Sequence, residues 1–330
     1  MVLIISKDME PSTDKVIDWL YYLGIPFRRI NGVDLLSPDL PASLTISQEK
    51  LDVHFMGDVK ADLSEITAVW YRRDATWHVL EAPIAAIRNE AYYNDIVLHL
   101  NNETSIAKKA LYSFLNIEKK VLGNFGKSTL NKIEILALAK GVGLDVPATL
   151  ITRSKADVRN FIDSHGPVIT KALWESPGIL IQKEQLESYT SYTEEITPEI
   201  MEAIPETFYY SLFQEKLEKE LDLRIFYLDG TCYAMAIFSQ LNNQTKVDFR
   251  KYANNRNVPY HLPETVTQHI TQLMQLLQLN TGSVDIVKTK DGRYAFLEIN
   301  PVGQYDMTSV PCNYQLDKKI AQFLSQHEQQ

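Results

Sequence analysis

The strongest constraint on the fold is a hairpin pattern near the C-terminal end of the chain, at residues 281–306. Residues 283–288 and 294–299 each form a mainly apolar run, and Asp291-Gly292 between them is typical of a hairpin turn. The following proline and glycine end the second run. The sequence therefore predicts two antiparallel strands joined by a tight turn.

Three oxygen-bearing side chains lie on this hairpin. Two-residue alternation puts Glu298 and Asn300 on one face of the second strand, and Asp285 on the first strand can point to the same side. Buried carboxylates are costly unless a cation or basic group pairs with them, and carboxylate and amide oxygens are ligands that Mg²⁺ accepts. The hairpin alone fits a metal site and a half-exposed strand with solvated polar residues equally well.

Composition narrows the class of protein. The chain has 330 residues and a formal net charge of −9, which argues against nucleic-acid binding through phosphate contacts but leaves room for ATP in a local basic pocket. Cys232 and Cys312 share no metal-like spacing, and no apolar run has the length of a membrane span. With no secretory signal, the expected location is the cytoplasm.

The pattern of the N-terminal third predicts an open α/β domain. A strand at residues 2–6, a helix capped by Ser12 or Thr13, and a strand at 27–31 give a strand–helix–strand opening. A later apolar strand ends in Arg72-Arg73. We interpret this pair as a solvated strand end, and keep as the alternative a cationic rim that faces a carboxylate or phosphate.

The rest of the chain mixes helices and strands. Residues 81–115 are mostly helical, with a break expected at Asn101-Asn102, and the later Gly-Lys-Ser at 126–128 lacks the glycine spacing of a phosphate-binding P-loop. The other predicted elements are a strand at 120–124, a helix at 129–140 capped by Thr129, a helix capped by Ser154, a strand at 167–171 paired with 179–183, a strand at 210–217, a hairpin around Asp229-Gly230, a helix at 265–279 and a terminal helix at 312–324.

The order of charged residues resembles that of the ATP-grasp superfamily, in which two α+β subdomains hold ATP between them. That order is Lys171, then Gln214 to Leu217, Asp222 with Arg224, Arg250, and finally Asp285…Glu298-x-Asn300. Further pieces resemble the peptide-maturing ligases of graspetide (microviridin-like) pathways, of the "grasp-with-spasm" type. They are Ile4-Ile5-Ser6, Arg29-Ile30-Asn31, Val69-Trp70-Tyr71-Arg72-Arg73, Phe238-Ser239-Gln240, Asp248-Phe249-Arg250 and Glu298 to Gln304.

The resemblance implies a mixed α/β and α+β chain with the ATP-grasp fold. Its parts would be an N-terminal open α/β domain at residues 1–124, a central ATP-grasp subdomain at 125–213, and a C-terminal ATP-grasp subdomain with the metal site at 214–330.

The resemblance also implies ATP and Mg²⁺ as cofactors, with a role for each matching residue. The nucleotide phosphates would be contacted by Lys171 and by Lys132 or, less well matched, Lys127. Adenine would be recognised by Glu215 and the backbone of Lys216 and Leu217, and the ribose by Asp222 or Glu220. The transferred phosphoryl group would be bound by Arg224 and Arg250, and Mg²⁺ by Asp285, Glu298 and Asn300.

The chemistry implied is ATP-driven activation of a carboxylate. An Asp or Glu side chain would attack the γ-phosphate to give an acylphosphate and ADP, and a Thr or Ser hydroxyl (or a Lys amine) would then displace phosphate to form an ester or amide. Both groups would belong to one ribosomal precursor peptide, made of a leader and a core, so that the product is a macrocycle. Leader recognition would fall near residues 189–195.

Two other functions stay open at this point. One is another ATP-grasp ligase, which adds glutamate to a protein tail or joins small amino acids, and the other is a non-catalytic ATP-binding module. The sequence alone does not identify the precursor peptide, the ring pattern or the choice between ester and amide. It also leaves open a homodimeric state.

Overall fold

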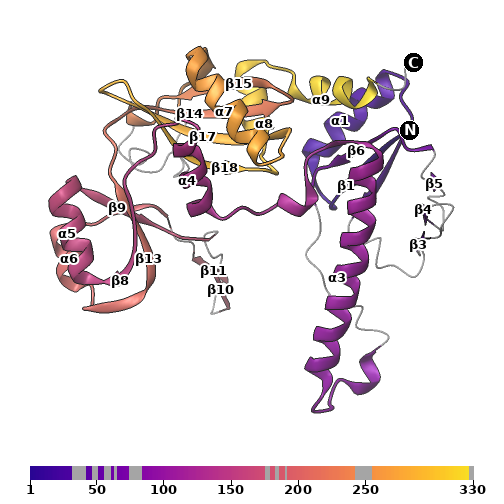
Figure 1. The fold of residues 1–330 in the computed structure, drawn as a ribbon, viewed down its shortest axis with the longest axis horizontal. Coiled ribbons are helices and arrows are strands. Elements are labelled where there is room, and N and C mark those ends of the chain that lie inside the picture. The colour runs from indigo at the N-terminus through magenta and orange to yellow at the C-terminus, as the bar shows by residue number, and fades with distance from the viewer. Residues whose placement is uncertain are drawn as a thin grey trace. The chain divides into compact units, whose positions relative to one another are not determined.

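The computed structural model describes residues 1–31, 42–46, 51–55, 61–62, 65–73, 84–174, 179–182, 186–189, 192–241 and 255–326 (Figure 1). The chain forms two compact units. Unit 1 contains residues 1–129, 278–282 and 304–330, and unit 2 contains residues 130–277 and 283–303. The predicted division at residues 124/125 and 213/214 stays a prediction.

Unit 1 is built on a four-stranded parallel sheet in the order β2-β1-β6-β7. Its strands are β1 (Val2–Ser6), β2 (Phe27–Asn31), β6 (Ala68–Tyr71) and β7 (Lys120–Leu122). β1 and β6 are fully buried, as expected for strands in the middle of a parallel sheet. This confirms the predicted open α/β opening of the chain. A small antiparallel sheet contains β3 (Ala42–Ile46), β4 (Leu51–Phe55) and β5 (Ala61–Asp62).

Helix α1 (Pro11–Tyr22) packs against the C-terminal helix α9 (Leu316–Ser325). The predicted cap was wrong. The N-cap is Glu10, without a side-chain cap, and Pro11 begins the helix because its fixed φ suits the first helical position. Ser12 and Thr13 lie inside the first turn, where their hydroxyls bond Glu10 and Ser6 instead of capping.

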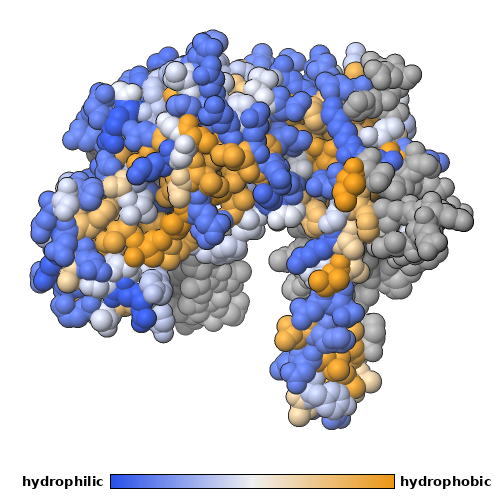
Figure 2. Space-filling view, viewed as in Figure 1, coloured by the Kyte–Doolittle hydropathy of each residue, from blue (hydrophilic) through white to orange (hydrophobic). Residues whose placement is uncertain are grey.

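Helix α3 (Tyr93–Glu118) is continuous over 26 residues, so the break expected at Asn101-Asn102 was wrong. Both asparagines lie on exposed or half-buried positions of the helix, where their weak helix propensity costs little. A short 3-10 turn, η3 (Ala85–Ile87), precedes it. Hydrophobic patches interrupt the polar surface along α3 (Figure 2).

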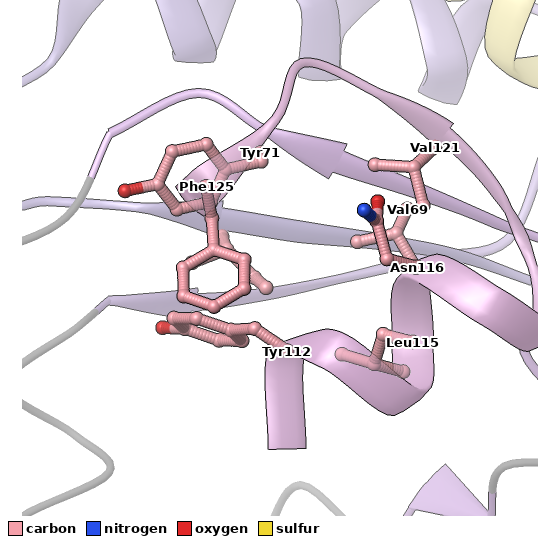
Figure 3. Close-up of a pocket in the computed structure, with 8 residues that line it drawn as sticks. Val69, Tyr71, Tyr112, Leu115, Asn116, Val121 and Phe125 are labelled. Atoms are coloured by element: carbon pink, nitrogen blue, oxygen red, sulfur yellow. The ribbon is translucent and has the colours of Figure 1, made fainter. Parts of the chain in front are cut away.

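The C-terminal part of α3 is the part that packs on the sheet. Tyr112 makes edge-to-face contacts with Tyr71 of β6 and with Phe125 of the 3-10 turn η4 (Phe125–Lys127). These rings, with Leu115, Asn116, Val69 and Val121, surround a cavity of about 10 Å³ (Figure 3). This space is no larger than a single water molecule requires, so the cluster is a packed core rather than a ligand pocket.

Unit 2 contains two larger sheets. The first has the order β12-β9-β13-β8, and α5 (Lys155–His165) and α6 (Pro198–Ala203) cover one of its faces through the core around Val158, Met201 and Phe213. Its strands are β8 (Thr149–Ser154), β9 (Val168–Lys171), β12 (Glu194–Glu195) and β13 (Thr207–Glu215). Ser154 caps α5 as predicted, because its side chain accepts the N–H of Asp157.

The predicted partner of β9 was wrong. β10 (Ile179–Gln182) pairs with β11 (Leu186–Tyr189) in a separate hairpin, whereas β9 lies between β12 and β13. The reason is that both edges of β9 are occupied, one by β12 and the other by β13, so that no edge is left for β10.

The second sheet has the order β16-β15-β14-β17-β18. Its strands are β14 (Lys219–Leu228), β15 (Thr231–Ile237), β16 (Asn257–Tyr260), β17 (Thr281–Thr289) and β18 (Tyr294–Asn300). Asp229 and Gly230 both have positive φ, as a tight hairpin turn requires, so the predicted hairpin is confirmed. A 3-10 turn, η5 (Ser239–Leu241), follows β15.

The remaining helices are α4 (Lys132–Gly141), α7 (Glu264–Leu276) and α8 (Asp306–Cys312). Asn131, not Thr129, caps α4, because its side chain accepts the N–H groups of Ile133 and Glu134. The terminal helix predicted at 312–324 is α9, which begins only at Leu316, because Cys312 ends α8 and Asn313 after it takes a left-handed conformation. In the part of the chain that the structure describes, none of the helices has the length and apolar character needed to cross a bilayer.

Candidate functional site

The β17–β18 hairpin of unit 2 brings the predicted metal ligands together. In the antiparallel register Asp285 lies opposite Glu298, and Ser283 lies opposite Asn300. Residues directly opposite each other, and residues two apart on one strand, share a face of the sheet. All three predicted ligands therefore lie on one face, as the two-residue alternation indicated. Ser283 joins them there, and the sequence reasoning missed it.

Each carboxylate of this face contacts a basic side chain. Arg224 of β14, the strand next to β17, donates through Nη1 to both oxygens of Asp285, at 2.7 and 2.6 Å. Lys132, the first residue of α4, places Nζ 3.6 Å from Oε2 of Glu298. The same ammonium group donates to the carbonyl of Trp174 at 3.1 Å. Two predicted phosphate-contacting cations thus lie against two predicted metal ligands.

Two buried polar atoms of this face have no hydrogen-bond partner among the described residues. They are Oγ of Ser283 and Nε of Arg224. A buried donor without a partner costs free energy, so such atoms mark places where a ligand can supply the missing bond. An anionic group is the natural acceptor for Arg224 Nε.

The oxygens of this face suit Mg²⁺, and the arginine and lysine suit phosphate. In the described part of the chain no three His, Cys, Asp or Glu residues cluster as a metal site. The hairpin itself supplies two carboxylates and an amide, so a bound Mg²⁺ would need further oxygens, which nucleotide phosphates provide.

Asp222, the predicted ribose contact, lies on β14 near Arg224, and its carboxylate is hydrogen-bonded to side chains of the protein. Its carboxylate is buried and accepts hydrogen bonds from Nζ of Lys219, at 2.9 Å, and from the hydroxyl of Ser239. Ser239 belongs to the segment that carried the family resemblance, although no role was predicted for it. Glu220, the alternative ribose contact, pairs with Lys288 at 3.0 Å, and this hydrogen bond raises the pKa of the lysine.

The segment predicted to read adenine also has internal partners. Glu215 accepts one hydrogen bond from Arg293, at 2.9 Å, and one from the backbone N–H of Ala148, at 3.1 Å. The N–H of Lys216 donates to the carbonyl of Pro167, and its ammonium group donates to Glu195. Leu217 follows in the turn between β13 and β14. The carboxylate of Glu215 therefore fixes the end of β13, and no sequence signal pointed to Arg293.

Lys171, at the end of β9, lines a cavity of about 330 Å³ in unit 2. The other lining residues are Thr170, Ala172, Leu173, Tyr192, Glu194, Tyr210 and Ser211. The cavity has the size of a small-molecule site. It brings the predicted phosphate lysine together with Tyr192 and Glu194, which belong to the stretch expected to recognise a leader peptide.

Two further predicted residues remain, Arg250 and Lys127. Arg250 is outside the described residues, as are Asp248 and Phe249 before it. Lys127, the weaker phosphate candidate, lies in η4 of unit 1, whereas Lys132 lies in unit 2 beside Glu298. The placement of Lys132 next to a predicted metal ligand favours it over Lys127.

A comparison with protein-family models decides the family. The model described as "RimK-like ATP-grasp domain" matches residues 129–324, which is more than half of the chain. The chain belongs to the RimK-like ATP-grasp family. It is therefore an ATP-grasp ligase, and the superfamily resemblance seen in the sequence is confirmed.

Solved structures agree with this assignment of an ATP-grasp fold. A Chryseobacterium gregarium RiPP-associated ATP-grasp ligase, in complex with ADP and a leader and core peptide, is 25% identical, with a TM-score of 0.81 over 98% of this chain and 96% of that chain. Macrocyclase MdnC from Microcystis aeruginosa MRC, bound with precursor peptide MdnA, is 25% identical, with a TM-score of 0.77 over 98% of each chain. The sequence matches no curated protein significantly.

A third solved structure agrees at the level of the fold. PsnB, complexed with a phosphomimetic variant of its minimal precursor, Mg and ADP, is 17% identical and shares the fold, with a TM-score of 0.73 over 98% of this chain and 97% of that chain. The predicted cofactors, ATP and Mg²⁺, agree with the membership of this chain in the ATP-grasp family.

Proposed function

We propose that the chain is a peptide-maturing ATP-grasp ligase. It activates Asp or Glu side chains of a ribosomal precursor peptide and joins them to Thr or Ser hydroxyls, or to Lys amines, as macrocyclic esters or amides. The observation that carries the proposal is the match, over nearly the full length of both chains, to two ligases whose structures contain a precursor peptide or its leader and core. The N-terminal sequence pieces that resemble graspetide ligases give independent support.

The charged side chains on the β17–β18 face are suited to bind the phosphates of ATP together with Mg²⁺, as an ATP-dependent reaction requires. ATP provides the phosphoryl group that activates the carboxylate, and Mg²⁺ screens the phosphate charge. Asp285, Glu298 and Asn300 would hold the metal, while Lys132 and Lys171 would bind phosphate oxygens. Arg224 would orient the transferred group, because Asp285 holds its guanidinium in place and its buried Nε can donate a hydrogen bond to a phosphate oxygen. Arg250 would complete this clamp.

Lys171 is assigned to phosphate, but Tyr192, Glu194 and Tyr210, which line the same 330 Å³ cavity, support a proposal for how the peptide is recognised. Tyr192 and Tyr210 offer aromatic surface, and Glu194 offers a carboxylate that a basic leader residue can pair with. A leader bound here would hold the attached core within reach of the same enzyme molecule, which raises its effective concentration.

The decisive experiment begins with the open reading frames beside the gene, among which a short one with Thr/Ser- and Asp/Glu-rich C-terminal repeats would encode the candidate precursor. Incubated with the full chain, ATP and Mg²⁺, it should lose one water per ring, as read by mass spectrometry. Mild alkali should restore the mass if the links are esters, and leave it unchanged if they are amides. A gain of mass would indicate amino-acid addition, and nucleotide binding without any product would indicate a non-catalytic module.

A matched pair of variants ties the product to the candidate site. Glu298→Gln should abolish the loss of water, because Glu298 is a candidate metal ligand on the hairpin face. Glu202→Gln should leave it unchanged, since Glu202 is 77% exposed on α6 and pairs with Arg159. Wild-type turnover by Glu298→Gln would remove that residue from the metal site.

A further inference from the structure

The arginine pair at the end of β6 was interpreted from the sequence as a solvated strand end, and for Arg72 this was wrong. Its side chain is only 4% exposed. It donates to Ser12 Oγ, at 3.1 and 3.2 Å, and to Glu10 Oε1 at 3.2 Å, and its guanidinium lies 5.8 Å from the centre of the Tyr305 ring. We call Glu10, Ser12, Arg72, Arg73 and Tyr305 the arginine cluster.

The arginine cluster lies at the carboxyl end of the parallel sheet of unit 1, where hydrogen bonds hold its side chains in place. Glu10 follows β1 and Arg72 follows β6, so both lie at the carboxyl ends of neighbouring parallel strands. The hydroxyl of Tyr305 donates to the carbonyl of Ser12, which ties the segment after β18 to the cluster. In open α/β sheets, ligands bind outside the carboxyl ends of the strands.

Arg73 is the member that faces outward. Its side chain is 26% exposed, and Nε lies 2.9 Å from Glu10 Oε2, although the N–H is not aimed well enough for a hydrogen bond. In the described part of the chain, no acceptor meets the two terminal nitrogens of Arg73. One edge of this guanidinium is therefore available to a planar, two-oxygen anion.

The charges around Arg73 leave the cluster positive. The carboxylate of Glu10 forms ion pairs with both arginines. Burial of Glu10 would raise its pKa, but the hydrogen bond from Ser12 and the positive charges of Arg72, Arg73 and Lys7 have the larger effect and hold the pKa below its usual value. The nearby carboxylate of Asp306 is paired with Lys15 at 3.0 Å. Glu10 is thus ionised at neutral pH, and a second anion is still needed to balance the guanidinium of Arg73.

We propose that Arg73, held in place by Glu10 and Arg72, is a carboxylate-binding residue that takes an acidic side chain of the peptide substrate. The choice of a peptide carboxylate rests on the proposed function, in which the core carries Asp and Glu residues. Arg73 would position the peptide through an acidic residue and need not touch the reacting atoms. Arg72 is too deeply buried to serve this role, and its part is to orient the cluster.

The test is a binding measurement that needs neither ATP nor ring formation. The probes are two end-blocked synthetic hexapeptides, one with alternating Thr and Glu and the other with Gln in place of Glu, titrated into the full chain by calorimetry at low salt. The wild type should bind the Glu peptide about tenfold or more tightly than the Gln peptide. Arg73→Ala should bind the two peptides within about twofold of each other, and Arg73→Lys should fall between, because it keeps the charge but loses the paired donors.

Arg29→Ala is the matched control. Arg29 lies in the same unit, is 23% exposed and pairs with Asp14, so its loss changes the net charge equally. It should keep the wild-type preference for the Glu peptide. A preference retained in Arg73→Ala, an equal loss in Arg29→Ala, or no preference in the wild type would each overturn the proposal. Water loss by the natural precursor reports separately on the proposed function, so the two can fail independently.

Discussion

Arg224 Nη1 donates to both carboxylate oxygens of Asp285 across neighbouring strands of the second sheet of unit 2. The two side chains are 12% and 11% exposed. A nearly buried ion pair contributes little net stability, because desolvation opposes the attraction, but loss of one partner leaves an uncompensated charge. The pair therefore leaves neither charge uncompensated in the protein without ligand, and it places a predicted phosphate-binding arginine beside a predicted metal ligand.

This pairing predicts that Mg²⁺ can replace the arginine. Arg224→Met removes the cation and leaves Asp285 alone, so the free energy of unfolding should fall by about 3 kcal/mol in urea denaturation without metal. Millimolar Mg²⁺ should restore part of this loss in the variant and change the wild type less. The double variant Arg224→Met with Asp285→Asn should be more stable than the single variant and should not respond to Mg²⁺. An unresponsive single variant would show that Asp285 does not bind the metal.

Lys171→Ala should weaken ATP binding. A charge-assisted contact between an ammonium group and a phosphate contributes roughly 1.5–3 kcal/mol, which corresponds to an increase in Kd of about 10- to 150-fold by calorimetry. Cys232→Ser is the control, because Cys232 is a half-buried residue of β15 whose pKa burial raises to about 12, which leaves it an inert thiol. Equal affinities in the lysine variant and the wild type would remove Lys171 from the nucleotide site and favour a role in peptide binding.

Glu10→Gln should make the chain less stable at neutral pH and flatten its response to acid. The pKa of Glu10 is below its ordinary 4.5 in the folded chain, so its stabilising effect is present above pH 4.5 and is lost as the pH falls through the folded pKa. The variant should lose about 3 kcal/mol at pH 7, because both arginines lose their carboxylate. Urea denaturation from pH 7 to pH 3 should show the two stabilities converging, and a constant gap would contradict the prediction.

Several features set by nearby residues followed from the sequence, whereas the caps predicted for α1 and α4 and the break predicted in α3 did not. The β17–β18 hairpin, the Asp229-Gly230 turn and the Ser154 cap depend on side chains within a few positions of each other, and all three are present. Strand periodicity put Glu298 and Asn300 on one face and allowed Asp285 to share it, and the register of the two strands places Asp285 there.

Features set by distant pairing did not follow. Strand order decides that Arg224 meets Asp285, and fold packing decides that Lys132 meets Glu298; neither has a local signature. The same reason explains the wrong partner for β9 and the unexpected burial of Arg72, whose acceptor Glu10 comes from a loop far along the chain. Arg250 and the leader-binding stretch stay predictions.

Gly303→Ala should displace Asn300, a predicted metal ligand, although Gly303 is not itself a predicted ligand. A Cβ at Gly303 would lie 2.1 Å from Oγ of Ser283 and 2.5 Å from its backbone N, closer than any real contact, and β17 is too firmly paired to yield. The segment after Asn300 must therefore move, and with it the end of β18 that carries Asn300. Overpacking of this kind costs roughly 1–3 kcal/mol of stability, and we expect ATP turnover to fall further than stability does. Gly141→Ala is the matched control, since nothing lies within 4 Å of its added Cβ, and it should change neither quantity by much. Wild-type turnover in Gly303→Ala, at unchanged Mg²⁺ dependence, would mean that Asn300 is not part of the metal site.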